Sequence, residues 1–236
     1  MNAPVEHLLS KDRVDYPTAL AAMEERVSGI LDGSKPEALW FLEHPPLYTS
    51  GTSARQSDLL GNMPFPVFDA GRGGQWTYHG PGQRVVYVML DLKKRDTMDL
   101  RQYVKQLEQW IIATLAYFGV EGFTREERIG VWVNEALGIW DLGLEKEKRY
   151  SPMPNALSLT PNLREAKIAA LGIRVRKWVT FHGICLNVQP DLSHYNGIVP
   201  CGINNYGVTS LKALGISASM DEVDEVLKEE FGKIFT

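Results

Sequence analysis

Residues 72–92 read RGGQWTYHGPGQ followed by RVVYVMLDL, a glycine-rich stretch directly before an apolar run. The branched and aromatic residues of the run are typical of a buried β-strand. Glycine permits tight turns and close approach of the main chain to a bound molecule, and Arg72 and His79 lie among these glycines. We therefore predict a strand preceded by a loop that contacts a ligand, with a glycine-rich turn without a ligand as the alternative.

The same loop lacks two signatures of nucleotide binding. A phosphate-binding loop requires Gly-Lys-Ser or Gly-Lys-Thr after its first glycines, and no glycine of this stretch is followed by that sequence. Counted from Gly71 or Gly80, the third glycine of a dinucleotide fingerprint is replaced by Trp76 or Val85. The sequence thus argues against a nucleoside triphosphate or NAD site in this loop.

The composition indicates one globular domain. The chain has 236 residues, of which 44% are hydrophobic and 23% charged, and its formal net charge is −4. It contains no apolar stretch of about 18 residues, and residues 1–15 lack the apolar centre of a signal peptide. We therefore expect a single domain over residues 1–236, located in the cytoplasm. The negative net charge gives no general attraction for nucleic acid, and we expect neither a nucleic-acid nor a membrane partner.

Apolar spacing predicts an α+β fold, with a mixed β-sheet flanked by helices. Apolar residues recur at helical spacing in 16–31 and 100–118, and a third helix is predicted to begin at Ser219, which Glu222 would cap reciprocally. Strands are predicted at Ala38–Leu42, 84–92, 129–133, 167–175 and 179–188. Residues 167–171 are also compatible with a helical turn. Residues 144–165 lack periodicity and are predicted to be a mobile flap or a peripheral insert.

Cys201 is the strongest candidate for a nucleophile, because a proline before it and a glycine after it favour a turn that presents the thiol. A thiol with a pKa of about 8.5 is mostly protonated at neutral pH, so it requires a cation or base beside it. Lys167, at the head of an apolar segment, and His182 both qualify, and spacing in the sequence does not choose between them. Cys185 lies between apolar neighbours and is predicted to be a buried, inert thiol.

Taken together, four motifs in order resemble those of the lipoyl(octanoyl) transferases, which belong to the superfamily of biotin and lipoate protein ligases. They are RGGQWTYHGPGQ at 72–83, KIAALGIRVR at 167–176, TFHG at 180–183 and IVPCGI at 198–203. The resemblance implies the mixed sheet with packed helices of that superfamily. It also implies transfer of an octanoyl group from acyl carrier protein to a lysine of lipoyl domains through an acyl-cysteine. No metal and no cofactor are implied, because the thioester supplies the activation that a ligase obtains from ATP.

The resemblance assigns roles to individual residues. Cys201 matches the acyl-accepting nucleophile, and Lys167 matches the lysine that lowers the thiol pKa and carries protons. His182 is predicted to line the same pocket. The residues that match the acyl and pantetheine site are Arg72, Gly73, Gly74, Gln75, Trp76, Thr77, Tyr78, His79, Ala170, Leu171, Gly172, Gly183, Ile184 and Cys185.

The resemblance also implies partners. Octanoyl acyl carrier protein would be the donor, and the acceptors would be apo lipoyl domains of 2-oxoacid dehydrogenases and the H protein of glycine cleavage. We expect the chain to act as a monomer. Residues 144–165 are longer than the turn that the family places before its lysine, and we expect them to cover the site or to touch the acceptor domain.

Three other functions are compatible with parts of the sequence. An ATP-dependent lipoate or biotin ligase would share the fold and would release pyrophosphate. A non-catalytic module could bind acylated proteins in the same groove without turnover. A thioesterase built on Cys201 and His182 would transfer the acyl group to water and would depend on His182 more than on Lys167.

Overall fold

The computed structural model describes residues 5–61, 64–126, 128–134, 165–198 and 207–235. Within these residues, eight strands form one mixed β-sheet in which β1, β2, β6, β10, β9, β8 and β7 follow one another and β11 pairs with β9. The strands are β1 Glu6–Leu9, β2 Ala38–Leu42, β6 Gln83–Met89, β7 Phe123–Arg125, β8 Arg128–Asn134, β9 Glu165–Arg176, β10 Val179–Asn187 and β11 Gly207–Val208. β1 and β11 pair parallel to their neighbours, whereas along β6, β10, β9 and β8 each strand is antiparallel to the next.

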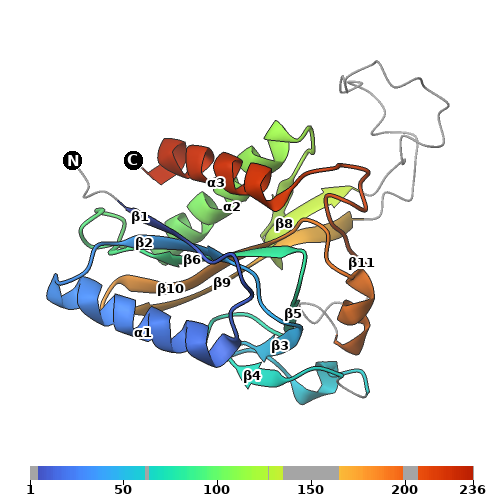
Figure 1. Cartoon of the computed structure of the whole chain (residues 1–236), viewed down its shortest axis with the longest axis horizontal. Coiled ribbons are helices and arrows are strands. Elements are labelled where there is room, and N and C mark those ends of the chain that lie inside the picture. Colours follow the sequence, from blue (N-terminus) through green and yellow to red (C-terminus); the bar gives the residue numbers. More distant parts are fainter. Residues whose placement is uncertain (1–4, 62–63, 127, 135–164, 199–206, 236) are drawn as a thin grey trace.

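Helices cover both faces of this sheet (Figure 1). Helix α1, Tyr16–Asp32, lies on one face, and helices α2, Leu100–Tyr117, and α3, Met220–Phe235, lie together on the other. Strand β6 serves both cores, because side chains alternate along a strand. Its residues Val85, Tyr87 and Met89 pack with α1, whereas Val86 and Val88 pack with α2 and α3. Both faces of the central strand are therefore closed to water.

A second, smaller sheet lies beside one end of the main sheet (Figure 1). Its strands are β3 Leu47–Ser50, β4 Val67–Asp69 and β5 Thr77–His79, with β3 in the centre. Tyr48 and Tyr78 of this sheet pack with Tyr195 of the 3₁₀ helix η4, Leu192–Gly197. A short 3₁₀ helix, η1, spans Gln56–Asp58.

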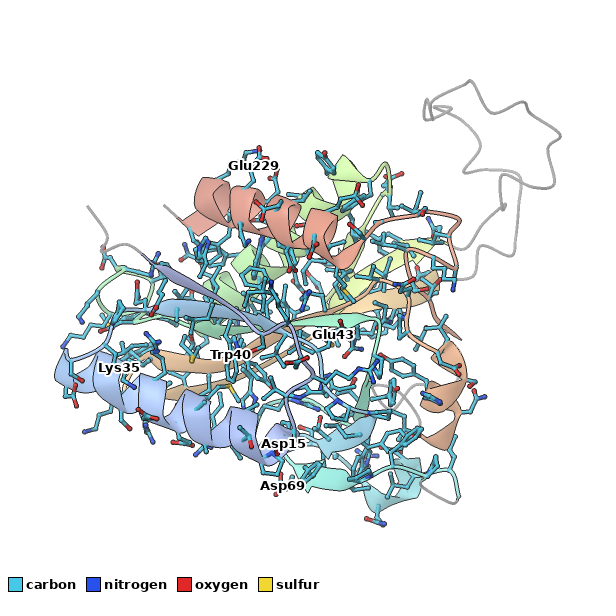
Figure 2. The ribbon with its side chains drawn as sticks, in the orientation of Figure 1. Asp15, Lys35, Trp40, Glu43, Asp69 and Glu229 are labelled. Carbon is cyan, nitrogen blue, oxygen red and sulfur yellow. The ribbon has the colours of Figure 1, made fainter. Side chains whose placement is uncertain are left out.

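Glu43 forms a hydrogen bond that connects the turn between β5 and β6 to the end of β2. This residue follows β2 and is labelled in Figure 2. Its Oε2 accepts a 2.7 Å hydrogen bond from the main-chain N–H of Gly82. Gly82 has φ 83°, and a Cβ there would overlap the main chain of Gln189. The last glycine of the glycine-rich stretch is thus required both by its backbone conformation and by close approach of another segment.

All three predicted helices are confirmed. Helix α1 ends at Asp32 and is capped by Gly33, which has φ 81°, and α2 ends two residues before Gly119. The predicted reciprocal cap of α3 is present: the Glu222 carboxylate accepts from the Ser219 N–H at 2.7 Å, and the Glu222 N–H donates to the Ser219 hydroxyl at 3.2 Å.

The five predicted strands are confirmed as well, and the alternative of a helical turn at 167–171 is wrong, because these residues lie within β9. Six short strands were not predicted from the sequence: β1, β3, β4, β5, β7 and β11. These strands are too short for a pattern of period two to stand out. Of the segment 144–165, residues 144–164 lie outside the described residues, and Glu165 begins β9. In the described part of the chain, no helix is long and apolar enough to cross a membrane.

Candidate active site

Lys167 lies near the start of β9, between β8 and β11. Its side chain is buried, with 6% exposed. The ammonium Nζ donates a 2.7 Å hydrogen bond to the main-chain carbonyl of Ile129 and lies 5.4 Å from the ring centroid of Trp132. The predicted setting of a poorly hydrated lysine is therefore present.

Gly130 makes the space for this lysine. A Cβ at residue 130 would overlap Lys167 Cε and would lie 2.8 Å from Lys167 Nζ. Gly130 also has φ 132°, which side chains other than glycine rarely adopt. The register between β8 and β9 shifts at this point, since Val131 faces Ala169 and the next residue, Trp132, faces Lys167. This bulge turns the lysine toward the main chain of β8.

Glu108 of α2 approaches the same place from the face of the sheet that α2 and α3 cover. Its Oε1 accepts a 3.2 Å hydrogen bond from the Gly130 N–H, and the side chain is buried. Burial raises the pKa of Glu108, while the Gly130 N–H, the Lys167 ammonium and Lys105 act in the opposite direction. Sequence reasoning missed Glu108 and Gly130. The available signals were a carboxylate within the apolar stripe of a helix and a single glycine inside a strand.

The Arg72 guanidinium lies among main-chain carbonyls of its own glycine-rich loop. The guanidinium donates to the carbonyls of Gly73 and Gln75 at 3.0 and 3.1 Å, and to the carbonyl and hydroxyl of Thr49 at 3.2 and 2.6 Å. Its aliphatic part lies directly over Gly172, where a Cβ would overlap Arg72 Cδ. Two segments that the sequence analysis placed in one site, 72–79 and 170–172, therefore meet.

The remaining residues of the predicted loop divide between two environments. Gly73 and Gly74 are exposed, Gln75 and Thr77 are partly buried, and the Gly73 N–H donates to the Ile173 carbonyl at 3.0 Å. Trp76 and Tyr78 are buried in the small core shared with η4. The Trp76 indole N–H donates to the Arg55 carbonyl at 2.8 Å. These two aromatic side chains hold the loop in place.

His182 has a buried ring nitrogen with no hydrogen-bond partner. The residue is 4% exposed and lies in β10 with φ 57°, and its Nε2 is the orphaned atom. The ring hydrogen-bonds to the Ala70 main chain and packs against Tyr87 with centroids 6.0 Å apart. Burial and the Arg72 guanidinium lower the pKa of His182 to about 4. A neutral imidazole with an unsatisfied nitrogen is suited to bind a polar group of a ligand.

His79 is held by a neighbouring glutamine. Its Nδ1 lies 2.7 Å from Gln83 Oε1, and its ring packs against His44 with centroids 5.9 Å apart. Burial, followed by the charges of His44 and Arg72, lowers the pKa of His79 to about 3. His44 in turn contacts the Val14 carbonyl and the Tyr87 hydroxyl, each at 2.6 Å. Burial thus lowers the pKa of His44, His79 and His182, and ring contacts connect these histidines directly or through Tyr87.

The predicted residues of β9 and β10 point to opposite faces. Gly183, Tyr87 and Gly172 face one another across three strands, and Cys185 faces Ala170. Ala170 and Cys185 pack in the core beneath α1, and Cys185 is buried, as predicted. The side chains of Leu171 and Ile184 pack in the opposite core. On the face of the sheet where Arg72 covers Gly172, these last two residues therefore present only their main chain.

Cys201 lies outside the described residues, but both flanking segments are anchored. Before it, Ile198 bridges to Leu59; after it, Gly207 pairs with Ala166, the neighbour of Lys167. Asn187 connects the two flanks. Its Oδ1 accepts from the Tyr195 hydroxyl at 3.2 Å and from Gln83 Nε2 at 2.9 Å, and its Nδ2 donates to the Thr209 carbonyl at 2.9 Å.

Comparison with known proteins identifies relatives over nearly the whole chain. The family model of the lipoyl protein ligase A/B catalytic domain matches residues 15–232. An octanoyltransferase of Paramagnetospirillum magneticum is 54% identical over 235 residues, which cover 100% of this chain and 99% of that protein. An octanoyltransferase of Jannaschia sp. is 53% identical over 231 residues, 98% of this chain and 99% of that protein.

Solved structures of lipoate protein ligases share the fold. A lipoate-protein ligase A bound with ATP matches with a TM-score of 0.62 and 16% identity, over 98% of this chain and 85% of that one. The bipartite lipoate protein ligase of Thermoplasma acidophilum matches with a TM-score of 0.61 and 15% identity, over 98% and 84%. The predicted mixed sheet with flanking helices is thereby confirmed. The chain belongs to the lipoyl protein ligase A/B catalytic domain family and, within it, to the octanoyltransferases.

Proposed function

We propose that this chain moves an octanoyl group from acyl carrier protein to a lysine of a lipoyl domain, with Cys201 as the nucleophile and Lys167 as the proton carrier. The observation that carries the proposal is the placement of β11. Gly207, at its start, pairs with Ala166, directly before the buried Lys167. Cys201 precedes Gly207 by a segment of chain that spans at most about 20 Å when fully extended. A tether of this length permits the contact between thiol and ammonium that the proposal requires.

In the first half-reaction, the Cys201 thiolate attacks the carbonyl carbon of the octanoyl thioester. The bond from that carbon to the pantetheine sulfur then breaks, and Lys167 gives one ammonium proton to the departing sulfur. The products are octanoyl-Cys201, a pantetheine thiol and a neutral Lys167. The 2.7 Å hydrogen bond from Nζ to the Ile129 carbonyl holds the amine in place throughout.

In the second half-reaction, the amine of the acceptor lysine attacks the octanoyl carbonyl of the acyl-cysteine. Neutral Lys167 takes a proton from the attacking nitrogen, and the carbon–sulfur bond to Cys201 breaks. An amide is formed, and the enzyme regains its thiolate and its ammonium. No external oxidant, metal or nucleotide enters this balance.

The acyl and pantetheine groups are proposed to bind beside the contact between Arg72 and Gly172, where the loop of Arg72 meets β9 and β10. The absence of a side chain at Gly172 lets Arg72 pack against β9 there, and the unsatisfied Nε2 of His182 offers one polar contact. The predicted substrate contacts of 72–79, 170–172 and 182–185 form part of this proposal.

Mass spectrometry after incubation with octanoyl acyl carrier protein tests the mechanism. The wild-type chain should gain one octanoyl group, and addition of an apo lipoyl domain should remove it. Cys201→Ser should carry no thioester, although it retains the buried thiol of Cys185. Unmodified wild type, or equal acylation of Cys201→Ser, would refute the acyl-cysteine route.

The same reagents separate the other functions. A ligase would acylate the lipoyl domain from octanoate and ATP without acyl carrier protein. A binding module would hold the acylated donor without transfer and would be indifferent to loss of Cys201. A thioesterase would release octanoate and would tolerate Lys167→Ala better than His182→Ala.

We also propose that the chain acts as a monomer in the cytoplasm. Its acceptors would be apo lipoyl domains of 2-oxoacid dehydrogenases or the glycine cleavage H protein. We further propose that residues 144–165 cover the site or contact the acceptor domain, because they lead directly into β9. Deletion of residues 144–162 should alter acceptor kinetics. Unchanged transfer to the lipoyl domain would exclude a role in acceptor binding.

A further inference from the structure

A single peptide group connects Lys167 to a buried carboxylate. The carbonyl of Ile129 accepts the 2.7 Å hydrogen bond from Lys167 Nζ, and the N–H of Gly130 donates the 3.2 Å hydrogen bond to Glu108 Oε1. These two groups belong to the same peptide unit. In a trans peptide they point in opposite directions, so the lysine and the carboxylate lie on opposite sides of it.

We propose that Glu108 is a positioning residue for octanoyl transfer, which holds and polarises the Ile129–Gly130 peptide so that its carbonyl fixes the Lys167 ammonium. The inference rests on the proposed function, because it takes Lys167 as the proton carrier. Hydrogen bonds in series strengthen one another, since an acceptor on the N–H increases the negative charge of the carbonyl. A carboxylate that accepts from the Gly130 N–H therefore makes the Ile129 carbonyl more negative. This strengthens its hydrogen bond to an ammonium more than its hydrogen bond to a neutral amine.

Three features of the site support this arrangement. Glu108 is 8% exposed on α2, between Leu107 and Ile111 of the hydrophobic core, where a carboxylate is costly unless it is hydrogen-bonded. Gly130 cannot carry a side chain without displacing the lysine. The charge of Lys167 also acts directly on Glu108 and favours its carboxylate form.

The charged groups around this unit determine how it responds to pH. Lys105 of α2 acts on Glu108, and Lys167 faces it from β9. Trp132 of β8 presents its ring to Lys167, and Arg128 of the same strand lies over that ring, 4.6 Å from its centroid. Glu165 of β9 is ion-paired with Arg128 at 2.7 Å, whereas Glu108 is the carboxylate that accepts from the Gly130 N–H. Loss of its charge is expected to destabilise the ammonium form of Lys167.

Glu108→Gln in the full chain tests the inference. Glutamine keeps an oxygen that can accept from Gly130 and removes only the charge. Glu126→Gln is the matched control, because Glu126 is an exposed glutamate in the turn before β8. Octanoyl transfer from octanoyl acyl carrier protein to an apo lipoyl domain is measured for both variants across the pH range, together with acyl-enzyme formation in a single turnover.

For Glu108→Gln we expect kcat to fall about tenfold, because a charge-assisted hydrogen bond becomes a neutral one, while KM for both protein substrates is retained. The basic limb of the kcat/KM profile should move to lower pH by about half a unit or more. Glu126→Gln should match wild type in both respects. A merely structural role of Glu108 predicts a lower unfolding free energy with an unmoved basic limb, and that result would overturn the inference.

Two further variants keep the outcome decisive. If Glu108→Gln is poorly folded, Glu108→Asp, which keeps the charge but shortens the side chain, should lower kcat without moving the basic limb. Lys167→Met separates this inference from the proposed function. An inactive Lys167→Met with a wild-type-like Glu108→Gln refutes the inference alone. An active Lys167→Met refutes the proposed role of the lysine and, with it, the need to position it.

Discussion

The side chain of Lys167 occupies the volume that a Cβ of Gly130 would fill. This relationship places a glycine of β8 among the residues that determine the orientation of the lysine in β9. Gly130→Ala should therefore lower kcat by about tenfold or more, because the ammonium can no longer remain 2.7 Å from the Ile129 carbonyl. Steady-state transfer assays measure the change, and an unaltered kcat would show that the geometry of the lysine is irrelevant to the rate.

Gly119→Ala is a control for the backbone part of this effect. Gly119 also has a positive φ, 75°, but a Cβ there would meet no atom within 4 Å. Strain alone should cost stability on the order of 1 kcal/mol. Gly119→Ala should accordingly show a lower unfolding free energy and an unchanged turnover per folded molecule. Equal losses of turnover in the two variants would assign the Gly130 effect to strain.

Asn187 should matter more for activity than for stability. It binds the Tyr195 hydroxyl on one flank of residues 199–206 and the Thr209 carbonyl on the other, and Cys201 lies between these flanks in the sequence. Asn187→Ala should cost about 1–3 kcal/mol of unfolding free energy, because buried partners lose their hydrogen bonds. Transfer should fall further than the folded fraction explains.

Thr114→Val provides the comparison for Asn187. The Thr114 hydroxyl is buried and donates to the Trp110 carbonyl within α2, away from these flanks. Its loss should lower stability with little effect on turnover. Urea unfolding and transfer assays on the same preparations separate the two effects, and parallel losses in both variants would remove any special role for Asn187.

Arg72→Lys should destabilise the glycine-rich loop. The guanidinium serves four acceptors from Thr49, Gly73 and Gln75, which a lysine ammonium with a single nitrogen does not reach together. We expect a loss of about 2 kcal/mol in unfolding free energy, together with weaker transfer. Arg55→Lys, at an exposed position, should be silent. Wild-type stability in Arg72→Lys would show that the loop is held by other contacts.

The buried His182 should make stability fall in mild acid. Its pKa is about 4 in the folded chain and 6.5 as an ordinary imidazole. Between these values the unfolded chain binds a proton that the folded chain does not, so the contribution is complete above pH 6.5 and is lost as the pH falls toward 4. The slope is about 1.4 kcal/mol per pH unit. His79, with a pKa of about 3, acts in the same direction.

His182→Asn isolates this contribution. Asparagine tolerates a positive φ better than most residues and does not titrate in this range. Unfolding free energies from urea titrations should decline less steeply between pH 7.5 and pH 5 for the variant than for the wild type. Identical slopes would mean that His182 binds a proton in the folded chain near its ordinary pKa.

Much of the fold was predictable because long helices and strands repeat their apolar spacing over several turns or residue pairs. Helix α1 shows helical spacing and a terminal glycine, and the cap of α3 is readable as Ser219 followed by Glu222. The turn between β9 and β10 was harder to foresee. Lys177 and Trp178 adopt positive φ values of 49° and 69° without the glycine or asparagine that usually marks such a turn.

The candidate site was predictable only in part. The sequence motifs indicated that Lys167 is important, and the structure supplies its burial and its contact with Ile129. The resemblance gave no reason to single out Glu108, because its relation to the lysine runs through a peptide group in another strand. A contact between three elements depends on the shift of register at Val131, which a linear pattern does not encode.

The order of strands has a consequence for synthesis of the chain. Strand β6 finds one neighbour, β2, in the segment already made, but its other neighbour, β10, emerges from the ribosome only after β7, β8 and β9. Until then one edge of β6 has unpaired amides and carbonyls, and both of its faces are apolar. A nascent or truncated polypeptide that ends before β10 is therefore vulnerable to aggregation, and completion of the chain is what removes that exposure.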